Sequence, residues 1–481
     1  MPKRSGEGEN VRRIVPVLSI SALLLAVVGC GGGSSSSSSS SAGSVAGGNT
    51  IVTSGNNVAP LIVDAGPVPA TNPQANVAFT TVVVCAPGTP TCVTIDHVMV
   101  DTGSTGLRIP ATAFAGFSNG SAVLAALQNV SPTTPVAECV QFLDGSFFWG
   151  SVRSADIKMG GSNNDSEVAS SVPIHVMGDP NLPTANSIPS TCSSAATVSG
   201  SAGAGEEDTV TALGANGLLG VGNYQYDCDI LGYGNLCTSF ANLPTGLYYY
   251  TCPSSSACSA PTSVTLNQQV RNPVALFTAD NNGVIVELPS VPTGGQLGIS
   301  AGQGSLVFGI GTQSNNALAS SAVVLPLDSN ASDLALGGFT TVYNGVSYPN
   351  SSSAISSFID SGSNGLYFLD QPTTSIAVCD GGWYCPSSTE SLTAINQATN
   401  GNSSKVQFNV SNADTLFNNN SGQDTAFSDL AAPNTSGVST PQAEDGFFDW
   451  GLPFFYGRNV YVGIWGMTPP SGVSSSPYWA Y

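Results

Sequence analysis

The stretch VMVDTGSTGLRIP, residues 98–110, decides the fold that we predict for this chain of 481 residues. In it an apolar strand ends at Asp101, and a small hydroxyl residue, a glycine and a serine follow. Residues 357–369, SFIDSGSNGLYFL, repeat this order with Asp360 in the place of Asp101. A motif that recurs with matching apolar flanks predicts two related halves, each with an aspartate at the end of a strand.

Two aspartates on such loops are suited to acid–base chemistry. Two carboxylates that face one another share a proton, because both cannot ionise easily at once. One can then act as a general base on water while the other acts as an acid toward a carbonyl oxygen. The alternative is a pair of unrelated surface turns, since Asp-Ser/Thr-Gly is common turn chemistry; the second copy favours the first interpretation. The catalytic candidates are Asp101 and Asp360, with Thr102, Gly103, Ser104, Ser361, Gly362 and Ser363 as supporting loop residues.

The composition favours an all-β protein that does not bind nucleic acid. Short valine- and isoleucine-rich runs alternate with turn residues, and the chain has 55 glycines. Ten Lys and Arg against 30 Asp and Glu give a net charge of -20, which argues against nucleic acid or an anionic membrane surface as a partner. Few basic groups also limit the positive charge that accumulates when carboxylates protonate, which favours tolerance of acid. We interpret His97 and His175 as strand residues with satisfied hydrogen bonds rather than as catalytic groups.

The first 55 residues have the features of an exported, lipid-anchored protein. A basic start and an apolar run over residues 14–28 predict a signal peptide over residues 1–29. Cys30 follows as in an imperfect bacterial lipobox, where it would be diacylated; the alternative is an ordinary signal peptide with an incidental cysteine. Residues 30–55 begin with a Gly/Ser tether that cannot pack. By analogy with lipoprotein sorting, Gly31 favours the outer membrane, on its periplasmic or its surface face.

The cysteines predict disulfides. Ten of the 11 cysteines remain after Cys30, and an even number in an exported chain indicates paired thiols. Four pairs are close neighbours in sequence, and the fifth joins the two cysteines that are left. The predicted pairs are Cys85–Cys92, Cys228–Cys237, Cys252–Cys258, Cys379–Cys385 and Cys139–Cys192.

The duplicated Asp-[Thr/Ser]-Gly-Ser motif resembles the active-site signature of the pepsin-like aspartic peptidases. The similarity extends to GSVRSADIKMGG (150–161), GLLGVG (217–222), GSLVFGIG (304–311), Trp450-Gly451 and RNVYVGIW (458–465). It implies an all-β, bilobal fold with a cleft between two related lobes, each of which contributes one aspartate. We therefore predict an N-terminal lobe over residues 56–313 and a C-terminal lobe over residues 314–481.

The chain departs from that family at the flap, the hairpin expected to cover the site. The position of the family's flap tyrosine falls on Phe142 or Leu143, and that of its partner tryptophan falls on Arg108. Asp144 and Gly145 still suit a hairpin tip. The aromatic residues 147–149 are interpreted either as an apolar lid or as packing. Residues 195–212 and 224–265 are expected to be surface loops held by disulfides, and the tyrosines at 248–250 are candidates to line a groove.

The first functional hypothesis is an exported, lipid-anchored aspartic endopeptidase. It would be a monomer that acts on a peptide or protein, needs no cofactor or metal, and reaches the membrane only through its N-terminal lipid. The second hypothesis is a catalytically silent surface protein of the same fold that binds a peptide or a glycan. The replaced flap residues motivate this alternative, because a fold settles architecture better than it settles activity.

Overall fold

The computed structural model describes residues 49–142, 146–182, 188–193, 205–239, 246–253, 258, 261–328, 338–349, 356–379, 381–434 and 446–481, and all structural statements below refer to these. The predicted signal peptide, Cys30 and most of the linker lie outside them. Within these ranges strands dominate, and no helix is long and apolar enough to cross a membrane.

The first half of the chain forms long strands from its β-branched runs. β3 shows how: it alternates between exposed and buried residues and ends in four buried ones, the pattern of a strand that enters a protein core. The long strands are β1 (Val58–Val63), β2 (Ala78–Cys85), β3 (Cys92–Asp101), β4 (Thr105–Pro110), β6 (Val136–Gln141), β7 (Ser146–Met159), β8 (Glu167–Met177) and β10 (Gly217–Val221).

Shorter elements connect these strands. The short strands are β5 (Gln128–Asn129), β9 (Gly205–Glu206), β11 (Asp229–Ile230), β12 (Gly234–Asn235) and β13 (Leu247–Thr251). The α-helices are α1 (Ala111–Gly116), α2 (Gly120–Ala126), α3 (Ser190–Ser193) and α4 (Val210–Leu213), and 3-10 turns lie at Leu236–Thr238, Leu266–Gln268 and Pro273–Leu276.

The second half is built from shorter strands. Before it come β14 (Gly283–Leu288) and β15 (Ile299–Phe308). Its strands are β16 (Val324–Pro326), β17 (Thr340–Tyr343), β18 (Val346–Tyr348), β19 (Phe358–Ile359), β20 (Leu366–Phe368), β21 (Glu390–Gln397), β22 (Ser403–Val410), β23 (Ala431–Ala432), β24 (Phe448–Trp450), β25 (Arg458–Gly463) and β26 (Tyr478–Ala480). Its helices are α5 (Gln371–Thr374) and α6 (Ala413–Asn418), with 3-10 turns at Asn419–Gly422 and Leu452–Phe454.

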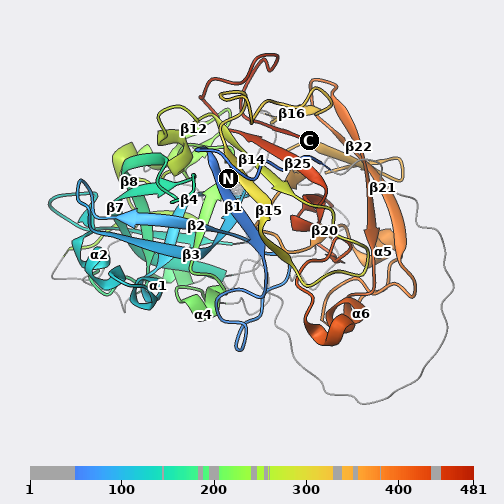
Figure 1. Ribbon diagram of the computed structural model, residues 1–481, viewed down its shortest axis with the longest axis horizontal. Helices are drawn as coiled ribbons and strands as arrows, with labels where there is room; N and C mark the ends of the chain where they lie inside the picture. The colour runs from blue at the N-terminus through green and yellow to red at the C-terminus, as the bar shows by residue number, and fades with distance from the viewer. Residues whose placement is uncertain are drawn as a thin grey trace, which may run out of the picture.

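One 16-stranded sheet joins the two halves. Fourteen of its strands run in the order β13-β6-β7-β8-β4-β10-β3-β2-β1-β15-β14-β25-β26-β16, and β5 and β9 each pair with β7 off this path. In Figure 1 the early strands lie on one side, the late orange and red segments on the other, and β14 and β15 lie between them beside β25. β14 pairs with β25 along six residues, so the sheet continues past the predicted boundary at residue 313 into the last strands of the chain. The division into lobes at that residue stays a prediction.

The same three-strand unit occurs in both halves. β10 lies between β3, with which it is parallel, and β4, with which it is antiparallel. β24 lies in the same way between the parallel β19 and the antiparallel β20. In the first unit Gly220 is opposite Asp101, and in the second Trp450 is opposite Ile359, one residue before Asp360. This repeat confirms the all-β fold with two related halves.

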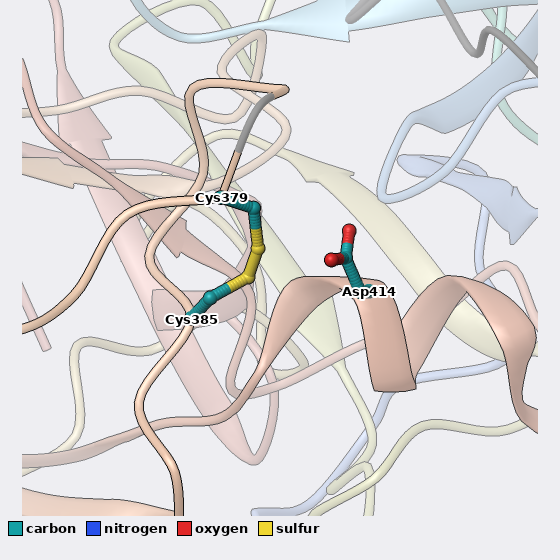
Figure 2. Close-up of side chains that lie close together, drawn as sticks. All are labelled: Cys379, Cys385 and Asp414. Carbon is teal, nitrogen blue, oxygen red and sulfur yellow. A yellow bond between two sulfur atoms is a disulfide. The ribbon is translucent and has the colours of Figure 1, made fainter.

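All five predicted disulfides are present in the structure. Cys379 and Cys385 also lie beside Asp414 (Figure 2), and within the described residues these three are the one group of His, Cys, Asp or Glu side chains with ligand atoms close enough to hold a metal ion. Metals bind the thiolate form of cysteine. Because the two sulfur atoms are bonded to each other, we interpret this group as a structural disulfide.

The prediction that residues 224–265 are surface loops is wrong for β13. This strand pairs along its whole length with β6, and Tyr249 and Tyr250 are fully buried. The alternating side chains of a strand reach both faces of the sheet, so Tyr249 packs with one apolar cluster and Tyr250 with another. These two rings therefore belong to the core and do not line a groove.

Candidate active site

The Asp101 loop is shaped by hydrogen bonds to its own carboxylate. Asp101 is the last residue of β3, and it is buried. The backbone N–H of Gly103 donates to Asp101 Oδ1 at 2.8 Å, and the Ser104 hydroxyl donates to Oδ2. Both oxygens of the carboxylate are thus held by donors from the next three residues, which fixes the direction of the side chain.

The Asp360 loop repeats this arrangement. The N–H of Gly362 donates to Asp360 Oδ1 at 2.8 Å, and Ser363 Oγ lies 2.8 Å from Oδ2. Asp360 is also fully buried, directly after β19. The two halves therefore present their carboxylates with the same local geometry.

The two loops interlock through their hydroxyl residues. The N–H of Thr102 donates to Ser361 Oγ at 3.1 Å, and the N–H of Ser361 donates to Thr102 Oγ1 at 2.9 Å. Each hydroxyl then donates across to the other half: Thr102 to the carbonyl of Ile359 at 3.2 Å, and Ser361 to the carbonyl of Val100 at 2.7 Å. These four reciprocal bonds hold the two aspartate loops against each other.

The glycines between the loops explain how closely the aspartates approach. A Cβ on Gly103 would lie 2.6 Å from Cγ of Asp360, and a Cβ on Gly362 would lie 2.6 Å from Oδ1 of Asp101. Real Cβ atoms do not approach that closely, so only glycine fits at either position. Each loop therefore rests directly on the carboxylate of the other half.

The two carboxyl groups have unlike charged neighbours. Burial raises the pKa of Asp101 above its usual value, although hydrogen bonds with Asp360 and Ser104 and the positive charge of Arg108 offset part of this rise. Burial, together with the negative charges of Asp101 and Asp449, raises the pKa of Asp360 well above its usual value. Both carboxyl groups therefore favour the protonated form more than a free aspartate does, and they differ in their charged neighbours: the cation Arg108 acts on Asp101 and the acid Asp449 acts on Asp360.

Arg108 lies in a buried ionic cluster instead of at the open mouth of a site. Its Nη1 donates to the carbonyl of Thr105 at 2.7 Å, and its Nη2 donates to Glu138 Oε1 at 2.7 Å and lies 3.4 Å from Asp227 Oδ2. Burial lowers the pKa of Arg108, but the negative charges of Glu138 and Asp227 outweigh it and raise the pKa above its usual value. The guanidinium therefore stays charged.

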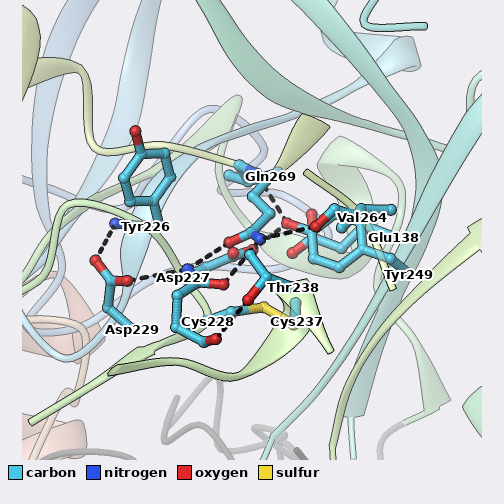
Figure 3. Close-up of a disulfide and its surroundings, with 12 residues drawn as sticks. Glu138, Tyr226, Asp227, Cys228, Asp229, Cys237, Thr238, Tyr249, Val264 and Gln269 are labelled. Carbon is cyan, nitrogen blue, oxygen red and sulfur yellow. Dashed lines mark hydrogen bonds between the residues drawn. A yellow bond between two sulfur atoms is a disulfide. The ribbon is translucent and has the colours of Figure 1, made fainter. Parts of the chain in front are cut away.

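Two further side chains, His175 and Tyr249, complete this Arg108 cluster. His175 Nδ1 lies 3.0 Å from Glu138 Oε2, and the Tyr249 hydroxyl donates to Asp227 Oδ2 at 2.7 Å. Figure 3 shows Glu138, Asp227 and Tyr249 beside the Cys228–Cys237 disulfide. Burial and the nearby charge of Glu138 raise the pKa of Asp227 well above its usual value. For Glu138, burial raises the pKa, but the charges of Arg108 and His175 outweigh it and lower the pKa below its usual value, so Glu138 is the acid that balances Arg108.

The hairpin predicted as the flap forms from β6 and β7 and is braced on both edges, and its place over the aspartates stays a prediction. β6 and β7 pair antiparallel, and the N–H of Phe142 donates to the carbonyl of Ser146 at 2.9 Å. Its tip residues Leu143, Asp144 and Gly145 lie outside the described residues. β13 covers the free edge of β6, β9 pairs with the start of β7, and the disulfide Cys139–Cys192 holds β6 to α3. The aromatic residues at 147–149 are buried, which favours packing over an apolar lid.

The histidines take no part in the contacts of either aspartate loop. His97 lies half-buried between Asp64 and Asp96, at 3.2 Å and 2.9 Å. The hydrogen bond with Asp64, offset in part by burial and strengthened by Asp96, raises the pKa of His97 to about 9. His175 belongs to the Arg108 cluster. The expectation of satisfied hydrogen bonds is confirmed for His97. It is wrong for His175, whose two buried ring nitrogens make no hydrogen bond although Nδ1 lies close to Glu138.

Sequence reasoning missed Glu138, Asp227 and Asp449. Two of them had a signal, because Glu138 lies in the apolar run VAECVQF and Asp449 in FFDWG. Acids are almost never fully buried without a partner, so a charged residue inside an apolar strand indicates an ionic contact. Nothing in the sequence indicates which residue is that partner.

Residues 53–481 match the family described as "Protein of unknown function (DUF3443)", and the chain belongs to that family. A solved structure, the aspartic proteinase from Irpex lacteus, is similar to this chain at a TM-score of 0.42 and 15% identity, covering 84% of this chain and 92% of that one. A similarity this low carries no argument, so the fold stands on the strand topology described above. No curated protein matches the chain.

Proposed function

We propose that this member of the DUF3443 family is an aspartic endopeptidase that hydrolyses peptide bonds with a water molecule activated between Asp101 and Asp360. The observation that carries the proposal is the reciprocal geometry of the two loops. Each carboxylate receives a backbone N–H and a serine hydroxyl from its own loop, and each loop is bonded to the other. Such preorganisation of two acids is what general acid–base catalysis requires.

The unlike charged neighbours of the two aspartates support a division of roles, with Asp101 as the ionised base and Asp360 as the acid that holds the proton. Asp101, the carboxylate, accepts a proton from water as the oxygen attacks the peptide carbonyl carbon. Asp360 gives its proton to the carbonyl oxygen, which produces a neutral tetrahedral diol. When the C–N bond breaks, Asp101 returns its proton to the amine nitrogen and Asp360 recovers one from a diol hydroxyl. The products are an acid and an amine, and both aspartates regain their starting state.

The experiment that tests the proposal is proteolysis of a denatured protein between pH 3 and pH 7. The purified chain is compared with Asp101→Asn and with the same chain in the presence of a statine-type inhibitor. We expect cleavage by the unmodified chain alone. Cleavage that survives both the substitution and the inhibitor would exclude the dyad mechanism, and absence of cleavage by the unmodified chain at every pH would exclude the peptidase.

A second candidate function is peptide binding without hydrolysis. It is favoured by the burial of both aspartates and by the bracing of the flap by β9, β13 and the Cys139–Cys192 disulfide. A flap held on both edges opens less readily, which slows the exchange of substrate and product. Tight binding of a statine-type peptide by calorimetry, together with no cleavage of any substrate, is the result expected of this alternative.

The leader supports a further part of the proposal, which is export and attachment to a membrane by a lipid on Cys30. The five disulfides are consistent with an oxidising compartment outside the cytosol. The test is metabolic labelling with a fatty acid in a bacterial host. Label and membrane association are expected for the unmodified chain and neither for Cys30→Ala; equal membrane association of the two would contradict a lipid at Cys30.

A further inference from the structure

Asp449 breaks the symmetry of the two halves next to the dyad. In the first unit Leu218, Leu219 and Gly220 run beside Met99, Val100 and Asp101. In the second unit Asp449 and Trp450 run beside Phe358 and Ile359. Asp449 thus occupies the place of the apolar Leu218, and it is only 3% exposed. Burying a carboxyl group is costly unless a partner compensates it, so this exchange calls for a local partner.

The partner is the serine that also holds Asp360. Ser363 Oγ lies 2.6 Å from Asp449 Oδ2 and 2.8 Å from Asp360 Oδ2. A hydroxyl group carries one proton and donates to one oxygen at a time. When Ser363 donates to Asp449, a hydrogen bond between Ser363 and Asp360 requires that Asp360 carry a proton and donate it to Ser363 Oγ. When Ser363 donates to Asp360, the hydrogen bond with Asp449 requires a proton on Asp449 in the same way. The two acids therefore share a proton across Ser363.

We propose that Asp449 is a positioning residue of the dyad: acting through Ser363, its carboxyl group keeps the shared proton on Asp360 and extends activity to higher pH. The inference rests on the proposed peptidase function. The comparison of the two loops favours it, because Ser104, the counterpart of Ser363, bonds Asp101, on which the positive charge of Arg108 acts. One half of the dyad thus adjoins a positive charge and the other a third acid.

Two residues lie opposite Asp449 on the neighbouring strands of its sheet. β20 places Tyr367 directly opposite Asp449, and its hydroxyl donates to Asn364 Oδ1 at 2.6 Å. β19 contributes the apolar Phe358 at the other side. The acids that act on Asp360 are Asp101 and Asp449, and both raise its pKa in addition to burial. Removal of the Asp449 charge therefore lowers the pH at which Asp360 loses its proton.

The test is the pH profile of kcat/KM for Asp449→Asn. The amide removes the charge and donates to Ser363, which leaves the serine proton for an ionised Asp360. We expect the alkaline limb to move to lower pH by about one unit or more, with kcat/KM on the acid side nearly unchanged. Asp449→Leu, which installs the residue of the first half, is expected to move the limb in the same direction. The matched control is Asp429→Asn, another buried acid of the second half, whose carboxylate accepts from Gly294 N–H.

The role of Ser363 is tested by repeating Asp449→Asn in a Ser363→Ala background. We expect a smaller shift of the limb there than in the unmodified chain. An equal shift in both backgrounds would show that Asp449 does not act through Ser363. An unmoved limb in active Asp449→Asn and Asp449→Leu would overturn the inference and leave the peptidase proposal intact.

A chain that cleaves nothing would overturn the proposed function but would still allow this coupling to be measured. The melting temperature is then followed from pH 4 to pH 8. Because the pKa of Asp360 is raised on folding, its contribution to stability is lost as the pH rises through that raised value. A shallower decline is expected for Asp449→Asn than for the unmodified chain. Equal slopes would exclude the shared proton.

Discussion

In the first half of the molecule, the strand that follows Asp101 carries Arg108 into a buried cluster with Glu138 and Asp227. In the second half, the strand that runs beside Asp360 carries Asp449 to the serine of the Asp360 loop. The backbone of the two loops and their hydrogen bonds are alike. The difference lies in the charged residues outside the two loops: the cation Arg108 acts on Asp101, and the acid Asp449 acts on Asp360. A duplicated fold can therefore place unlike charges beside two carboxyl groups that have the same local geometry.

Removal of either aspartate is expected to have the largest effect. Asp101→Asn eliminates the proposed base and Asp360→Asn the proposed acid, and such a group contributes about 10²- to 10⁴-fold to a reaction of this kind. We expect kcat/KM to fall by at least this factor in both variants. Their stabilities should differ, because Asp360→Asn also relieves the repulsion from Asp101 and Asp449. By calorimetry at pH 7, we expect Asp360→Asn to raise the melting temperature and Asp101→Asn to raise it less. Equal increases in melting temperature would contradict a stronger repulsion at Asp360 than at Asp101.

The cation side of the comparison is tested by Arg108→Met. The substitution leaves Glu138 buried without the guanidinium that balances it, and breaking a buried pair in this way costs about 3–5 kcal/mol. We expect the free energy of unfolding, measured with denaturant at pH 7, to fall by that amount. Lys405→Met, on the exposed face of β22, is the control and should change it little. If Arg108→Met and Lys405→Met have the same free energy of unfolding, Arg108 does not stabilise the buried cluster.

The interlock between the loops is expected to have an intermediate effect. Thr102→Val leaves the N–H of Ser361 without its acceptor, and Ser361→Ala leaves the N–H of Thr102 without its own. An unsatisfied buried donor costs about 1–3 kcal/mol. We expect each substitution to lower the free energy of unfolding by that amount and the double variant to lose less than the sum. If the losses of the two single variants add up to that of the double variant, the two loops do not stabilise each other, which would contradict the interlock. Thr94→Val, on an exposed position of β3, serves as the control.

The smallest expected effect concerns pairs of acids away from the dyad. Burial, together with the neighbouring Asp280, raises the pKa of Glu167 to about 7, and burial with Asp208 raises that of Glu206 to about 7. A carboxyl group whose pKa is raised on folding contributes stability below its unfolded pKa, and this contribution is lost as the pH rises through the folded pKa. His97, with its pKa raised to about 9, loses its contribution between about pH 6.5 and pH 9.

We therefore expect the melting temperature to decline from about pH 4.5 to pH 9, in the direction expected of an acid-tolerant protein. Glu167→Gln should flatten the part of the decline between about pH 4.5 and pH 7, and His97→Gln the part above about pH 6.5. Scanning calorimetry across this range measures both. A melting temperature that rises from pH 5 to pH 8 would contradict the raised pKa values.

Much of the fold followed from local patterns. The β-branched runs predicted β2 and β3 within one or two residues, and the close spacing of cysteines predicted four disulfides. The loop expected around the tyrosines at 248–250 was wrong, because β13 is a strand only through its pairing with β6, more than 100 residues earlier in the chain. Residues 224–265, which contain β13, are rich in Ser, Gly and Cys, and they have no local pattern from which this pairing can be inferred.

The sequence by itself determined that two Asp-[Thr/Ser]-Gly-Ser loops exist, that each follows a buried strand, and that glycines allow the loops to approach. Turn chemistry and strand periodicity are local, so they can be inferred from neighbouring residues. Only the tertiary structure decided which charges lie beside each aspartate. Arg108 contacts Glu138 and Asp227, which lie 30 and 119 residues away in the sequence. Ser363, which holds Asp360, contacts Asp449, 86 residues further along the chain. Burial then makes those contacts strong, because water no longer screens the charges.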